Sequence, residues 1–258
     1  MPEGWLRCTP ESLLIGSIIF LSPLQSRAQA IKPAQPIEIR AEAGAVISHG
    51  NTDNQSFNAK FDYAREWRRW RQALGSSGVY AADDAGATAQ RWDVRGQTDY
   101  KFLSKGFSFV SARYEQDRFS GFVYQSAFTL GLGWRFFDND QTRLVAQIGG
   151  GYRHLHTRDS VADDGVTLIP GGPQEDFVEQ GVIDFDHELN PNTRIRDQFQ
   201  IEVGMDNTQV RNDLSLQVKM LSSLALAVGY SVRYNTDPPA GFETTDTLST
   251  LNLVYELH

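Results

Sequence analysis

Charged side chains recur at every second position along much of this chain. Arg91, Asp93 and Arg95, for example, alternate with Trp92 and Val94. In an extended strand, successive side chains point to opposite faces, so this spacing separates a charged face from an apolar one. A face that carries arginines and carboxylates is suited to lining a polar pore. The candidate pore-lining residues are Arg40, Glu42, Lys60, Asp62, Arg91, Asp93, Arg95, Arg113, Glu115, Arg135, Arg153, Asp184, Asp186, Glu202, Arg211, Asp213 and Arg233.

The same charged face has a second interpretation, as a filled interior of paired charges. Unpaired charges in a narrow lumen are costly unless water reaches them. A barrel of this size lies between small closed barrels and open porins, so a narrow or gated pore and a filled interior both stay open. The mixed signs of the charges argue against strong ion selectivity.

Two histidines, His154 and His156, are the other residues that suggest chemistry. They share the parity of Leu144, Ile148 and Tyr152, which places them outward and near one rim. We find no serine and acid on that face to complete a hydrolytic set, although Asp159 and Ser160 follow in the adjoining segment. Amphipathic rings are common at a membrane interface, and this is the favoured interpretation.

Acidic pairs at Asp83-Asp84 and Asp163-Asp164 raise the question of calcium. Neither pair has the ligand spacing of a dedicated calcium loop. We therefore expect solvated loop charge there, and we predict no metal, no cofactor and no catalytic residue.

The elements that would position these residues follow from the same period-two pattern. About twelve such segments occur in residues 37–258, many of them roughly ten residues long, which is enough for a tilted strand to cross a membrane. Long connections, at 81–89, 117–124, 157–175 and 236–243, alternate with short ones. This organisation predicts an all-β fold, a transmembrane antiparallel up-and-down barrel with both of its ends on the periplasmic side of an outer membrane.

Phe107 and Phe109 do not fit the alternation. They are an even number of positions from Arg113 and Glu115 in the fifth predicted strand, so the alternation places both rings on the charged face. A β-bulge between them and the rest of the strand would restore an outward position for both rings.

Composition and the N-terminal residues support export to a membrane. The mean hydropathy is −0.39 and no apolar run is long enough for a spanning helix. The net charge of −8 disfavours nucleic-acid binding. The short apolar core Leu13–Leu24 and the sequence Ala28-Gln29-Ala30 predict a signal peptide over 1–30, cleaved after Ala30 and followed by an extended lead-in over 31–36. The single cysteine, Cys8, would leave with it.

The end of the chain suggests partners. Leu253, Tyr255 and Leu257 alternate with polar residues, as in the last strand of outer-membrane barrels, but His258 replaces the usual terminal aromatic. Expected partners are the barrel-assembly machinery and the outer-membrane lipid with its lipopolysaccharide. The sequence does not give the oligomeric state.

Several motifs together resemble one family. They are Gly50-Asn51-Thr52, Gly86-Ala87-Thr88-Ala89, Tyr114 to Phe119 with Gly121, Gly131-Leu132-Gly133, Gly149-Gly150-Gly151-Tyr152, and the Pro-rich segment Asp237 to Phe242 followed by Asp246. Their order is similar to that of the salt-induced outer membrane protein family (domain of unknown function 481).

The resemblance implies an outer-membrane barrel linked to salt or osmotic stress. We therefore expect a narrow channel or an envelope-stabilising protein rather than an enzyme. The alternatives are a lipid-modifying enzyme of the outer membrane, or a surface receptor or adhesin that uses the long loop 157–175.

Overall fold

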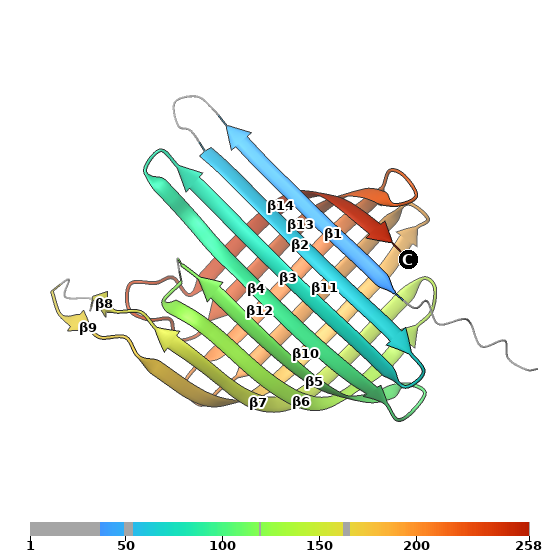
Figure 1. Cartoon of the computed structure of the whole chain (residues 1–258), viewed down its shortest axis with the longest axis horizontal. Helices are drawn as coiled ribbons and strands as arrows, with labels where there is room; N and C mark the ends of the chain where they lie inside the picture. The colour runs from blue at the N-terminus through green and yellow to red at the C-terminus, as the bar shows by residue number, and fades with distance from the viewer. Residues whose placement is uncertain (1–36, 49–53, 119, 162–165, 258) are drawn as a thin grey trace, which may run out of the picture. The chain divides into compact units, whose positions relative to one another are not determined.

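The computed structural model describes residues 37–48, 54–118, 120–161 and 166–257, and twelve strands of this part close into one antiparallel barrel (Figure 1). The predicted signal peptide, the lead-in, the 50–52 turn, Phe119, the Asp163-Asp164 pair and His258 lie outside the described residues. The barrel strands are β1 (Glu38–Ser48), β2 (Asn54–Trp67), β3 (Trp70–Asp83), β4 (Gly86–Lys101), β5 (Gly106–Asp117), β6 (Phe122–Asp138), β7 (Thr142–Thr157), β10 (Pro173–Asn190), β11 (Thr193–Val203), β12 (Thr208–Lys219), β13 (Leu224–Asn235) and β14 (Thr245–Leu257).

Strand order follows the chain around the barrel, and the ring is closed by β1 against β14, with Ile39 opposite Leu257. The predicted up-and-down topology and the expectation of about twelve strands are confirmed. We call the end of the barrel at which β1 begins and β14 finishes the terminal end. The opposite end is the hairpin end, because a short hairpin, β8 (Ser160–Val161) and β9 (Leu168–Ile169), follows β7 there.

Three predicted long connections are shorter than expected. The connection predicted at 117–124 ends early, because β6 already begins at Phe122. Within residues 81–89 only Asp84 and Ala85 form the turn, since β3 runs to Asp83 and β4 begins at Gly86. The segment has no clear apolar alternation because it consists largely of alanine and glycine, yet its backbone still pairs. Gly86 has a φ of 129°, a conformation that favours glycine in such a turn. Similarly, β10 already begins at Pro173, inside the predicted loop 157–175.

The outward face of the barrel is apolar over most of its height. Leu130, Leu132, Ile148, Val228 and Leu251 are all more than half exposed on it. A soluble protein would not leave so large a continuous apolar surface in water. A closed barrel with an apolar exterior and a polar interior is the form in which strands span an outer membrane.

No helix in the described part of the chain is long and apolar enough to cross a membrane.

The expected bulge at Phe107 and Phe109 is wrong. Over its described residues, β5 pairs with β4 and β6 without a register shift, and both rings point into the barrel, each 2% exposed. They pack with Val145 of β7, and Phe107 lies opposite Gly133 while Phe109 lies opposite Gly131. A Cβ added to Gly133 would overlap the Phe107 ring. The family-like glycines therefore make room for two inward aromatic rings.

Candidate functional site: the barrel lumen

Glu115 of β5 is the centre of an ion-pair cluster in the hairpin-end half of the lumen. Its side chain is 4% exposed and accepts hydrogen bonds from Arg113 of the same strand at 3.2 Å and from Arg211 of β12 at 2.7 Å. Arg233 of β13 also donates to it. In the ring of twelve strands, β13 lies half-way round from β5. The Arg233–Glu115 pair therefore bridges the full width of the lumen.

Glu202 of β11 extends this cluster. Both of its carboxylate oxygens accept from Nη2 of Arg113, each at 3.0 Å, which is a second bridge across the lumen. Gln200 and Gln180 donate to the same carboxylate at 2.6 and 3.4 Å. Charge-assisted bonds of this kind are stronger than neutral ones. The side chains of Arg113 and Glu202 that form this bridge are 12% and 2% exposed. The cluster fills the hairpin-end half of the lumen.

Nearer the hairpin end, Arg153 of β7 is buried to 1% exposure. Its Nη2 donates to Asp176 and to the carbonyl oxygen of Asn207, both at 3.2 Å. Among the described residues, its Nε and Nη1 have no hydrogen-bond partner.

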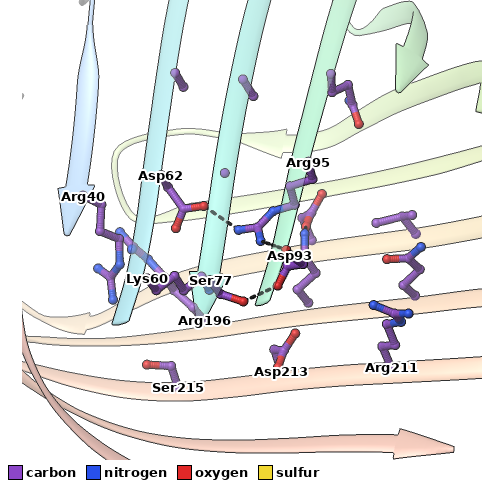
Figure 2. A pocket seen from close by; sticks show the side chains of 18 of the residues that line it. Arg40, Lys60, Asp62, Ser77, Asp93, Arg95, Arg196, Arg211, Asp213 and Ser215 are labelled. Carbon is purple, nitrogen blue, oxygen red and sulfur yellow. Dashed lines mark hydrogen bonds and ion pairs between the residues drawn. The ribbon is translucent and has the colours of Figure 1, made fainter. Parts of the chain in front are cut away.

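The terminal-end half of the lumen contains a chamber of about 530 Å³. Its lining extends from Glu38 and Glu256 at the terminal end to Arg113, Arg211 and Arg233, where the cluster begins. In Figure 2, Arg95 of β4 lies between Asp62 and Asp93, with Ser77 donating to Asp93, while Asp213 and Arg211 project from the strands behind. The chamber walls are therefore polar and carry both signs of charge.

Two chamber carboxylates are held by neutral donors. Asp184 of β10 accepts from Gln198 at 2.6 Å, and Asp213 of β12 accepts from Ser231 of β13. Neither forms an ion pair within the described part of the chain. These carboxylates face a space that water can fill, in contrast to Glu115 and Glu202.

The predicted pore-lining residues separate into two groups. Glu115, Arg153 and Glu202 do not line the chamber, since they are enclosed in or beside the cluster. It stays a prediction that the candidate side chains of either group border a conduction path. The fourteen that line the chamber are Arg40, Glu42, Lys60, Asp62, Arg91, Asp93, Arg95, Arg113, Arg135, Asp184, Asp186, Arg211, Asp213 and Arg233.

The sequence-based candidates omit several neutral residues of the interior and one buried acid. Gln209 of β12 donates to Gln125 of β6 at 3.1 Å across the lumen, and Thr129 donates to Gln180 at 3.0 Å. Asp99, 2% exposed, pairs with Arg71 at 3.4 Å. The alternation already indicates that these side chains point inward, but the sequence-based candidates include no neutral residue and leave out Asp99.

The histidines lie on the outward face, next to aromatic rings at the hairpin end. His154 Nε2 is 2.9 Å from the Tyr124 hydroxyl, and its Nδ1 is 3.3 Å from Glu175. An acid is therefore present on this face, contrary to the sequence analysis. Ser126 lies opposite His154, but its hydroxyl donates to the backbone carbonyl of His154 at 3.4 Å, so the set does not have the arrangement of a hydrolytic triad.

Comparisons with known proteins give relatives of low identity. Among solved structures, the chain is similar to the translocator domain of the autotransporter NalP from Neisseria meningitidis (TM-score 0.49, 10% identity, covering 88% of this chain and 90% of that one). It is also similar to the NanC porin (TM-score 0.44, 13% identity, 85% and 97%) and the KdgM porin (TM-score 0.42, 11% identity, 86% and 99%).

By sequence, the chain is 23% identical over 229 residues to a protein described as "Uncharacterized protein YdiY" from Escherichia coli (strain K12), with 86% of this chain and 84% of that protein covered. The family described as "Protein of unknown function, DUF481" matches residues 41–257. The motifs and the barrel agree with this match, and the chain belongs to that family.

Proposed function

We propose that the protein is a narrow outer-membrane channel for small polar solutes, closed in this conformation by the Glu115 cluster and used in the response to osmotic or salt stress. The stress link rests on the family resemblance. The observation that supports a channel is the polar chamber, which occupies one half of the lumen and ends at a layer of side chains. A purely structural barrel of this width has no need for a water-accessible cavity.

The closing layer is made only of side chains. The bridges from Arg113, Arg211 and Arg233 to the two glutamates link strands that are far apart around the barrel. Rotamer changes of a few side chains can break them without disturbing the backbone ladder.

The test is single-channel conductance of the refolded protein in planar bilayers. We expect the wild-type protein to be closed most of the time. Glu115→Gln keeps the shape of the side chain but removes the charge to which three arginines donate, so it should give frequent, discrete opening steps.

Glu66→Gln is the matched control. Glu66 pairs with Lys101 and lies 3.9 Å from Arg135 near the terminal end, outside the closing layer. It should leave the opening frequency unchanged. If folded Glu115→Gln is as silent as the wild-type protein, the channel proposal is wrong, and an envelope-stabilising role with a permanently filled lumen takes its place.

The hairpin β8–β9 favours a second candidate function, a surface receptor. Val166 and Leu168 are 85% and 63% exposed there, and Val161 and Ile169 are also exposed. Replacing residues 158–172 by a short glycine linker should abolish adhesion to host or abiotic surfaces while conductance persists. Unchanged adhesion of cells that carry this variant would exclude the receptor role.

A further inference from the structure

Asp197 of β11 points outward, into the apolar exterior of the barrel. Its neighbours on either side along the strand, Arg196 and Gln198, point into the lumen, where they donate to Asp186 and Asp184. In the sheet it lies between Phe185 of β10 and Leu214 of β12, and Leu214 is 40% exposed on the outward face. The strict alternation of a strand leaves the carboxyl group on the lipid side.

Asn212 of β12 is the hydrogen-bond partner of Asp197. Its Nδ2 donates to Oδ1 of Asp197 at 2.7 Å. Asn212 is also outward, since it lies between Phe199 of β11 and Val232 of β13. In the described part of the chain, the second N–H of Asn212 and Oδ2 of Asp197 have no further partner.

The pair lies deep in the apolar surface. Asp197 is four residues from the beginning of β11 and six from its end. Glu179 is another outward acid on this side, but it is level with Val203, the last residue of β11, and therefore near the rim. A rim carboxylate reaches water, whereas a short aspartate at mid-strand does not. An ionisable residue in such a position points to a functional contact.

We propose that the outward face of β11 and β12 is an interface with a second copy of this chain, centred on Asp197 and Asn212. The pair has one unused donor and one unused acceptor. A two-fold axis beside it places the free N–H of each Asn212 opposite the free Oδ2 of the other copy's Asp197, so both groups are satisfied. Lipid chains supply neither partner.

The surroundings of the pair suit such contact. Leu214, Leu216 and Tyr230 form an exposed apolar surface beside it, on β12 and β13. The contact is therefore a polar centre inside an apolar rim. In membranes, side-chain hydrogen bonds of this kind each contribute modestly, and two of them predict about a tenfold strengthening of the dimer.

Cysteine crosslinking in lipid vesicles tests the position of the interface. The background is the full chain with Cys8→Ser, which removes its single cysteine. Leu214→Cys should give disulfide-linked dimers. Val94→Cys is the matched control, since Val94 is 48% exposed at the middle of β4, half-way round the barrel from β12, and should stay monomeric. Equal crosslinking of the two variants, or none from either, would overturn the proposal.

The double variant Asp197→Leu/Asn212→Leu tests the role of the pair. Its dimer, measured by fluorescence energy transfer at increasing dilution in lipid, should dissociate at about tenfold higher protein density. The variant keeps an apolar, lipid-compatible surface, and its folding is checked by heat-modifiable gel mobility. An unchanged dimer refutes the role of the pair. A purified wild-type protein that is monomeric in vesicles refutes the second copy as occupant, leaving another membrane protein. Neither measurement depends on channel conductance, so the interface is tested independently of the proposed channel.

Discussion

The two halves of the lumen are built from the same alternation of inward polar residues, yet one is filled and the other is a chamber. In the hairpin-end half, Glu115 and Glu202 are 4% and 1% exposed and bond to arginines across the barrel. In the terminal-end half, Asp184 and Asp213 accept from neighbours on adjacent strands and face open space.

The direction in which the long side chains pair explains this difference. In the filled half, Arg233 of β13 reaches across the lumen to Glu115 of β5. On the chamber wall, Arg95 of β4 pairs with Asp93 of its own strand and with Asp62 of β2. A long side chain that pairs along the wall leaves the barrel axis open, so the width of this lumen depends on how its charges pair as well as on strand number.

The largest expected effect comes from removing a buried carboxylate of the filled half. Glu202→Ala leaves Arg113 with one fewer partner in a closed space, and loss of a partner from a buried ion pair typically costs about 3–5 kcal/mol. The free energy of unfolding, measured by urea titration of the protein in lipid vesicles, should fall by that amount. A loss under about 1 kcal/mol would show that water already reaches this half, and the contrast between the halves would disappear.

The alternation in the sequence was enough to predict the barrel, its approximate strand number and the inward direction of most charges. It could not show which charges meet. The contact between Arg233 and Glu115 depends on which strands lie opposite each other once the ring closes, and on how far the strands are staggered. Neither quantity appears in the local pattern of a strand.

The inward rings of Phe107 and Phe109 were missed for a related reason. Within a single strand, an aromatic residue at a position that the alternation assigns to the polar face suggests a shift in register. Gly133 and Gly149 on the next two strands supply the space, and a Cβ on Gly149 would lie 3.1 Å from the Phe109 ring. The signal was present in the glycine motifs, but only strand pairing links those glycines to the rings.

An intermediate effect is expected from Gly133→Ala. The added methyl group would overlap the Phe107 ring, and overpacking of a well-packed interior costs about 1–3 kcal/mol. Gly78→Ala is the control, since the nearest atom to its added Cβ is the Arg91 carbonyl oxygen at 3.9 Å. The same urea titration should separate the two variants. Equal stability of the two variants would mean that the Phe107 ring moves to accommodate the added methyl group at little cost.

The smallest effect on stability, and the most specific effect on function, is expected from Asp213→Asn. Its carboxylate has no ion-pair partner within the described residues and accepts a hydrogen bond from Ser231, which an amide oxygen can also accept. Stability should therefore change by no more than about 0.5 kcal/mol.

In the Glu115→Gln background, however, removing one negative charge from the chamber wall by Asp213→Asn should shift the reversal potential in asymmetric KCl toward anion preference. Asp184→Asn should act in the same direction, because its carboxylate is also held by a neutral donor. An unshifted reversal potential in both variants would place the conducting path away from the chamber, even if Glu115→Gln opens the protein.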